Sequence, residues 1–252
     1  MKKLILSFLT LLPVGLMAQN SGSITYEEKI QLKIDFGDNV PMSEDLKSMI
    51  PSSKSTEKIL LFNPKHSLYK NIDNKSGDEN ISQLTSESSI EVVLKRPENV
   101  TYQDLAANKV VEKQEFMDRI FLISDESEKQ AWKITGEQKE ILGYVCQQAT
   151  TVRDSSKIEA WFTPQIAVSS GPGKYGGLPG LILETNKNDG EAVVTAKHID
   201  LQTDINDQIV PPTKGKKVNR KQFNKIREEK MKEMELQYGG SGKGTRVFIQ
   251  RN

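Results

Sequence analysis

The stretch GGLPGLILE, from Gly176 to Glu184, joins a turn rich in glycine and proline to an apolar run. Proline cannot donate to a sheet ladder, and glycine adopts backbone conformations closed to other residues, so the strand is expected to begin after Pro179. Leu181, Ile182 and Leu183 then follow without a polar residue between them. Such a run is typical of a strand covered on both faces. The stretch predicts a rigid, closely packed corner that leads into a central strand.

Two-residue alternation of apolar and polar residues dominates the rest of the chain and predicts a sheet. It marks a long strand over residues 23–36 and two hairpins, one turning at Asn63-Pro64 and one at Asp189-Gly190. Further strand patterns recur between residues 89 and 170, and a last strand is expected in GTRVFIQRN near the carboxyl end. Consecutive strands with turns between them favour an antiparallel sheet over alternating strands and helices.

A few segments lack the alternation that predicts strands. A short helix is expected within residues 41–51, and residues 73–89 form a polar run that predicts a loop. A charged segment rich in helix formers predicts a carboxyl-terminal helix at about 217–238. The fold class is therefore α+β: a single domain over residues 19–252, with one large, curved, half-barrel-like antiparallel sheet and a carboxyl-terminal helix.

Residues 1–18 have the layout of a secretory signal peptide. Lys2 and Lys3 precede an apolar run from Leu4 to Met17, and Ala18 is a small residue suited to cleavage. This pattern predicts export to the periplasm or cell envelope, with no transmembrane segment in the mature chain. The 35 basic and 34 acidic residues give a net charge of +1, which argues against nucleic acid as a partner.

The residues that usually carry cofactors or metals are scarce. Cys146 is the single cysteine, and its strand pattern predicts a buried, unreactive thiol. His66 and His198 are the two histidines, and neither lies in a cluster with metal-ligand spacing. GGSGKGT (239–245) lacks the preceding strand and following helix of a phosphate-binding loop. We therefore expect no cofactor, no metal and no assignable catalytic set.

The motif GLPGLI (177–182) resembles the signature of the GLPGLI family, also called Porph_ging, of exported Bacteroidetes proteins. Trp161-Phe162-Thr163 before it and GYVCQQA (143–149) belong to the same resemblance. The family implies export and brings no established catalytic residue. The alternation in KEILGYVCQQATTV also resembles periplasmic lipoprotein carriers, which implies an open half-barrel plugged by helices; this is an analogy of fold alone.

Three functions remain open. The main hypothesis is a non-catalytic envelope protein that binds an apolar or peptide ligand, or that assists an outer-membrane system as its partner. The alternatives are a secreted hydrolase of peptide or glycan, in which Ser170, His198 and a carboxylate converge, and a structural surface protein without a ligand. For the main hypothesis, aromatic groups and a rigid loop suit an apolar pocket, and the expected ligand-binding residues are Trp132, Trp161, Tyr175, Leu178 and Pro179. The structural motif is expected to be Gly177, Leu178, Pro179, Gly180, Leu181 and Ile182.

Overall fold

The structure is a computed structural model that describes residues 20–32, 51–72, 79–84, 89–94, 98–238 and 245–249. The predicted signal peptide 1–18, the predicted short helix within 41–50 and the glycine-rich residues 239–244 lie outside the described residues. So do the last four residues of the predicted first strand, 33–36.

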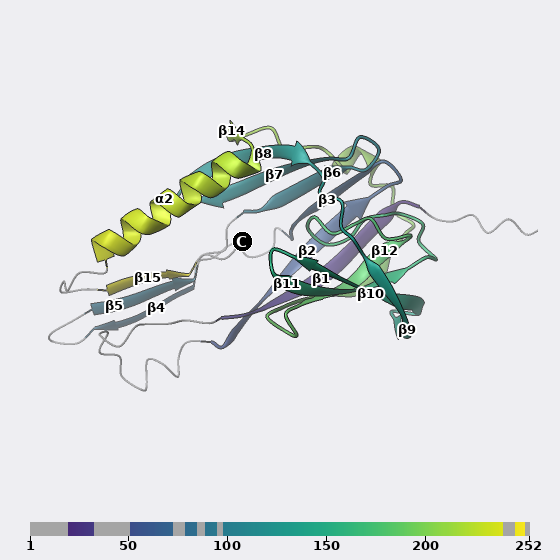
Figure 1. Ribbon diagram of the computed structural model, residues 1–252, viewed down its shortest axis with the longest axis horizontal. Coiled ribbons are helices and arrows are strands. Elements are labelled where there is room, and N and C mark those ends of the chain that lie inside the picture. Colours follow the sequence, from purple (N-terminus) through teal and green to yellow (C-terminus); the bar gives the residue numbers. More distant parts are fainter. Residues whose placement is uncertain are drawn as a thin grey trace, which may run out of the picture.

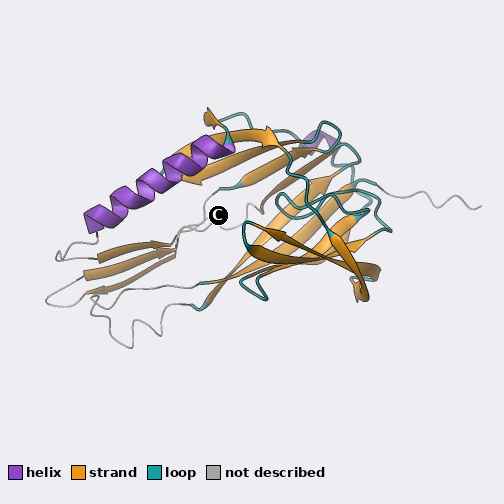
Figure 2. Ribbon diagram, viewed as in Figure 1, coloured by secondary structure: helices purple, strands orange, loops and turns teal. Residues whose placement is uncertain are grey.

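Strands make up most of the described chain, with one long helix near the carboxyl end (Figure 1; Figure 2). The elements are β1 (Gly22–Gln31), β2 (Ser53–Phe62), β3 (His66–Asn71), β4 (Glu79–Leu84), β5 (Ser89–Leu94), β6 (Val100–Asp104), β7 (Lys109–Phe116), β8 (Arg119–Glu126), β9 (Lys133–Ile141), β10 (Tyr144–Arg153), β11 (Ser156–Thr163), β12 (Leu181–Lys187), β13 (Ala192–Asp200), the 3-10 helix η1 (Asn206–Gln208), β14 (Lys216–Val218), α2 (Arg220–Tyr238) and β15 (Thr245–Ile249).

One open sheet of 12 strands organises the molecule, in the order β14-β8-β7-β6-β3-β2-β1-β13-β12-β11-β10-β9. Its neighbours pair antiparallel, except that β14 runs parallel to β8, so the sheet is mixed. Pairing of β1 with β13 joins an amino-terminal run of strands to a later one. The large sheet and the carboxyl-terminal helix confirm the predicted architecture at this level, and the sheet curves in Figure 1.

The two predicted hairpins are present. β2 and β3 turn at Asn63-Pro64, where the Asn63 side-chain Oδ1 accepts hydrogen bonds from the backbone N–H groups of Lys65 and His66. β12 and β13 turn over Asn188, Asp189 and Gly190, all with positive φ. Asparagine, aspartate and glycine tolerate that conformation best, so these turns follow directly from their sequences.

Two boundaries differ from the prediction. The run 73–89 is not wholly a loop, because β4 lies within it and pairs antiparallel with β5. β4 forms because its backbone pairs with the apolar strand β5 (SIEVVL), and the polar composition of the run does not predict this pairing. Together with β15, which runs parallel to β5, these strands form a second, three-stranded sheet. The helix begins at Arg220 and not at 217, because Lys216–Val218 pair with β8 as β14.

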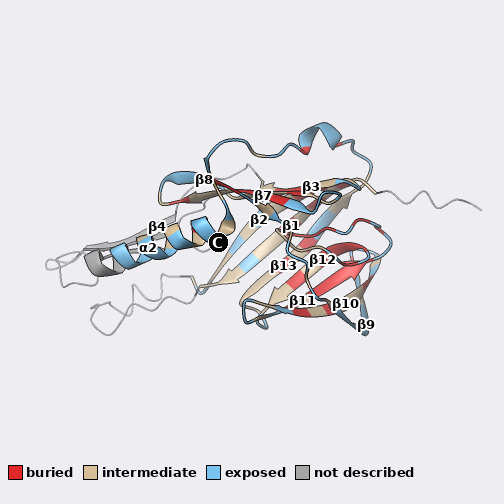
Figure 3. Ribbon diagram, turned by 45° about the horizontal axis from the view of Figure 1, so that its top comes forward, coloured by how far each residue is buried: buried red, intermediate tan, exposed pale blue. Residues whose placement is uncertain are grey.

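The GLPGLI corner packs as predicted. Leu181, Ile182 and Leu183 are fully buried, and β12 begins at Leu181, directly after the glycine-proline turn. Leu181 and Leu183 join the largest apolar cluster, whereas Ile182 packs in a second cluster with Phe162. The strand is thus covered on both faces, and Figure 3 shows buried residues on β12 and on the neighbouring strands β11 and β10.

Cys146 is fully buried in the largest cluster, while its neighbour Val145 is half exposed on the other face of β10. This confirms the predicted buried thiol. Burial raises the pKa of the Cys146 thiol to about 11, from 9.0 for an ordinary thiol. The reactive thiolate is therefore scarce in the folded protein at neutral pH.

Alkylation of Cys146 is expected to be about 100-fold slower in the folded protein than in urea at pH 8, because thiolate content falls tenfold with each pKa unit. Mass spectrometry of iodoacetamide-treated samples measures both rates, and Cys146→Ser supplies the unlabelled baseline. The unfolded chain loses the thiol proton first, so the free energy of unfolding should decrease as the pH rises from about 9 to about 11. Equal alkylation rates would contradict the burial.

Candidate functional site

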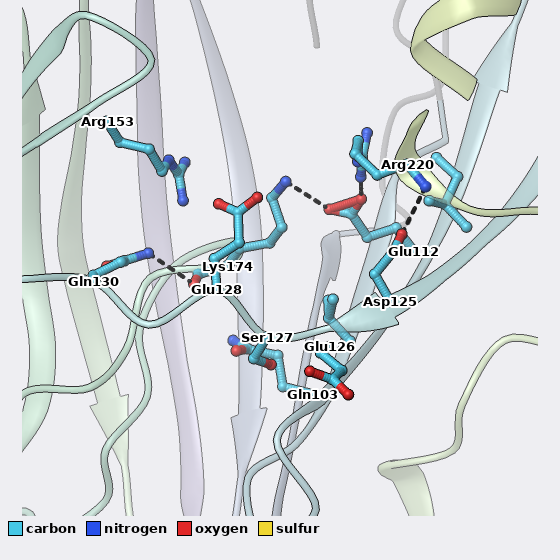
Figure 4. A pocket seen from close by; sticks show the side chains of 12 residues that line it. Gln103, Glu112, Asp125, Glu126, Ser127, Glu128, Gln130, Arg153, Lys174 and Arg220 are labelled. Carbon is cyan, nitrogen blue, oxygen red and sulfur yellow. Dashed lines mark hydrogen bonds and ion pairs between the residues drawn. The ribbon is translucent and has the colours of Figure 1, made fainter. Parts of the chain in front are cut away.

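A polar pocket of about 350 Å³ lies where distant parts of the chain meet (Figure 4). One wall comes from the adjacent strands β6, β7 and β8 and from the segment after β8. The end of β10, the loop before β12 and the first residue of α2 complete it. The lining residues are Gln103, Val110, Glu112, Ile123, Asp125, Glu126, Ser127, Glu128, Gln130, Arg153, Lys174 and Arg220.

Glu112 is the buried charge of this pocket. It lies on β7 and keeps only 4% of its side chain exposed. Lys174 Nζ lies 3.5 Å from one carboxylate oxygen, and the Arg220 guanidinium pairs with the other. A buried carboxylate is tolerated only with such partners, because removal from water disfavours an isolated charge strongly. Glu112 therefore ties the loop that carries Lys174 to the start of α2.

The start of α2 is determined by local sequence. Asn219 and Gln222 form a reciprocal cap, in which each side-chain oxygen accepts a hydrogen bond from the other residue's backbone N–H. The backbone N–H of Arg220 donates to Asp125 Oδ2 at 2.7 Å. One turn on, Phe223 is fully buried in an aromatic and aliphatic cluster with Phe121. These contacts place the Arg220 guanidinium beside Glu112. Burial lowers the pKa of the Arg220 guanidinium.

Lys174 reaches the pocket on the loop between β11 and β12, and side-chain N–H groups hold that loop by its carbonyl oxygens. The donors and acceptors are Gln103 Nε2 to Gly173 O at 3.1 Å, Gln130 Nε2 to Lys174 O at 3.4 Å, and Trp132 Nε1 to Gly176 O at 2.8 Å. Burial lowers the pKa of Lys174, and neighbouring Arg153 lowers it further. Glu128, Asp154 and Asp125 act in the opposite direction.

Arg153 and an acidic segment also line the pocket. The Arg153 guanidinium lies 5.1 Å from the centre of the Tyr175 ring, a cation–π contact. Glu126, the last residue of β8, and Glu128 in the segment that follows are both exposed. Because carboxylates accept hydrogen bonds and lysine and arginine donate them, the pocket can bind a ligand that does both.

Sequence reasoning missed this pocket. Charged residues make up 27% of the chain, so the acidic run Asp125-Glu126-Ser127-Glu128 does not stand out. One signal was present: alternation along β7 places Glu112 on the same buried face as Val110. A charge at a core position of an alternating strand points to a buried ion pair.

The predicted ligand-binding residues do not form one site. Trp161 lies in the largest core cluster, with Lys139 Nζ 4.3 Å from its ring centre. Trp132, Tyr175 and Leu178 pack instead with the second cluster, and Pro179 is exposed. The alternating faces of β11 separate the two groups, because Trp161 and Phe162 point to opposite sides. None of the five lines the pocket.

The catalytic set proposed for the hydrolase alternative is not assembled either. Ser170 is fully buried, and its hydroxyl donates to Ser67 Oγ at 2.9 Å. His198 is exposed on β13, paired with Thr25 of β1. Within the described ranges, no group of three or more His, Cys, Asp or Glu residues is arranged to hold a metal ion. The helices described there are not long and apolar enough to cross a membrane.

Comparison with known proteins matches a family model and several solved chains, among them two structures of PNGF-II. The family model described as N-glycanase peptide, N-terminal domain, matches residues 63–225. The structure of PNGF-II in the P21 space group is 23% identical, with a TM-score of 0.54 over 82% of this chain and 33% of that chain. The structure of PNGF-II in the C2 space group is 23% identical, with a TM-score of 0.52 over 82% and 32%. Comparison with curated proteins gives no match.

These findings correct two predictions. The matching family model is the N-glycanase one, so assignment to the GLPGLI family is wrong. The hexapeptide GLPGLI forms a closely packed corner. This is a local structural feature and does not by itself identify a family. The expected non-catalytic role with an apolar or peptide ligand is also wrong, because the matched family points to glycans and favours the hydrolase alternative. The chain spans about a third of the length of the two solved relatives, whose likeness concerns the fold.

Proposed function

This chain belongs to the family of the N-glycanase peptide, N-terminal domain, and on that premise we propose that it is a hydrolase of glycopeptides whose polar pocket binds the glycan. The observation that supports this best is the buried Glu112, held between Lys174 and Arg220 in a pocket whose lining residues all fall within the matched span 63–225. The chain spans about a third of the length of its solved relatives. We therefore propose, as a separate point, that this chain carries out the hydrolysis by itself.

The pocket has the chemistry that a sugar requires. Sugar hydroxyl groups both donate and accept hydrogen bonds, and the lining offers carboxylates as acceptors with Arg153 and Lys174 as donors. Gln103 and Gln130 add amide groups beside them. A volume of about 350 Å³ falls within the range of small-ligand sites. This supports a site for one or two sugar units.

Hydrolysis adds water across a bond, so one group must take a proton from water while another gives a proton to the leaving group. Glu112 is committed to its two cations, which leaves the acidic segment after β8 to supply the base. Glu128 lies close enough to raise the pKa of Lys174, whereas burial lowers it, and Figure 4 shows the two side chains next to each other. We assign Glu128 as general base and Lys174 as general acid.

Export of the chain and a half-barrel shape of the sheet are also part of this proposal. A signal peptide over residues 1–18 would deliver the chain to the periplasm or envelope, where glycopeptide substrates from outside the cell are met. The half-barrel description of the sheet is supported by its curvature in Figure 1.

Incubation of the purified chain with an N-glycosylated peptide is expected to release glycan from peptide, measured by mass spectrometry. Glu128→Gln should lower the rate about 100-fold or more, because loss of a general base typically costs that much. It should leave glycopeptide binding within a few-fold of the unchanged chain. Glu137→Gln, the same change at an exposed position on β9, is the matched control and should not affect the rate.

Two outcomes would contradict the proposal in different ways. Binding of the glycopeptide without release of glycan would make the pocket a recognition site and remove the hydrolytic step. Absence of both binding and release would remove the pocket's glycan-binding role as well.

A further inference from the structure

We infer that the pocket selects neutral glycans over acidic ones, such as glycans that end in sialic acid. This inference rests on the proposed function and adds the substrate class. The lining carries four carboxylates, those of Glu112, Asp125, Glu126 and Glu128, against the three cations of Arg153, Lys174 and Arg220. The lining of the pocket therefore carries one more negative than positive charge.

Two of the three cations are already committed. Arg220 and Lys174 both face the carboxylate of Glu112, which is almost completely buried. A ligand carboxylate that drew either cation away would leave Glu112 with fewer partners in a site shielded from water. Removing one partner from a buried ion pair costs more free energy than a new ion pair at an exposed position contributes. An acidic sugar therefore gains little from these two residues.

Arg153 is the third cation, and its surroundings are acidic. Its guanidinium packs over the Tyr175 ring, and Asp154 follows it in the chain. Glu126 and Glu128 also line the pocket and are exposed. A ligand carboxylate that approaches Arg153 therefore enters a pocket that carries two exposed carboxylates as well as this guanidinium.

A neutral glycan meets no such repulsion. Its hydroxyl groups can donate to Glu126, Glu128 and Asp125, which is the hydrogen-bonding role that ionised carboxylates fill best. Repulsion between an acidic sugar and two exposed carboxylates several ångströms away is modest in water. We expect it to weaken binding about tenfold at low salt. Because salt screens exposed charges, the difference should shrink as ionic strength rises.

The test compares one N-glycopeptide with and without its terminal sialic acids. Surface plasmon resonance with short injections over the full chain gives both dissociation constants. The sialylated form should bind about tenfold more weakly in low salt and nearly equally in high salt. Glu126→Gln/Glu128→Gln should bring the ratio of the two constants close to one. Glu137→Gln/Glu140→Gln, which removes two exposed carboxylates of β9 outside the pocket, should leave the ratio unchanged.

The outcomes separate this inference from the proposed function. Equal or tighter binding of the sialylated form in low salt would overturn the inference while the neutral form still supports glycan binding. If Arg153→Gln then abolished the tighter binding, the acid would be assigned to Arg153. Binding of neither glycopeptide would overturn the proposed function, and the inference with it.

Discussion

Replacing Gly180 with alanine is expected to lower the free energy of unfolding by about 3 kcal/mol or more, at the upper end of overpacking effects. A Cβ atom at position 180 would lie 2.1 Å from the carbonyl oxygen of Thr163 and 2.6 Å from its carbonyl carbon. Both are backbone atoms at the end of β11, so no side chain can move aside. Either β11 or the start of β12 must shift, and both are in the core.

Urea unfolding followed by tryptophan fluorescence measures this loss. Gly136→Ala is the matched control, because Gly136 also has a positive φ but a Cβ there would meet no atom within 4 Å. It should cost about 1 kcal/mol from backbone strain alone. A Gly180→Ala cost no larger than the control's would show that the corner is not closely packed.

Replacing Glu112 with glutamine is expected to cost about 3 kcal/mol, the lower end for removal of one partner from a buried ion pair. The amide keeps the shape of the side chain and removes its charge. Lys174 and Arg220 then face each other without the carboxylate with which both of them pair, and 35% and 26% of their side chains are exposed. That partial exposure to water is why the lower end of the range is expected.

Thermal unfolding by circular dichroism measures the loss, and Glu98→Gln is the matched control. Glu98 forms an ion pair with Lys113 at 2.7 Å but keeps 60% of its side chain exposed. Exposed pairs contribute less than about 1 kcal/mol. If the two variants lost the same stability, Glu112 would not be the buried centre of the pocket. Glu112→Gln should also weaken glycopeptide binding, because it releases the loop of Lys174 from the start of α2.

The structure separates features that are local in sequence from those that are not. The hairpin at Asn63-Pro64 depends on Asn63 accepting hydrogen bonds from residues two and three positions on, so its sequence predicts it. The buried triplet after Pro179 and the buried Cys146 likewise follow from alternation and turn chemistry. The misread stretch 73–89 shows the limit, because β4 depends on pairing with β5 and not on its own composition.

The predicted ligand-binding residues are not brought together, for a related reason. Trp161 and Trp132 are both aromatic and both belong to the predicted site, yet they pack in different clusters. Which face a residue takes depends on its place in the strand. Trp161 and Phe162 point to opposite sides of β11, and Trp132 packs on the side of Phe162.

The amino-acid sequence by itself determined most of the strands, the two hairpin turns and the rigid corner at Gly180, because each depends on residues a few positions apart. Only the tertiary structure decided the pocket. Its lining residues run from Gln103 to Arg220, and pairing of β1 with β13, folding back of the β11–β12 loop and docking of Phe223 bring them together. Such contacts join residues distant in the chain, and each depends on the burial of many others at once, which no short stretch of sequence encodes.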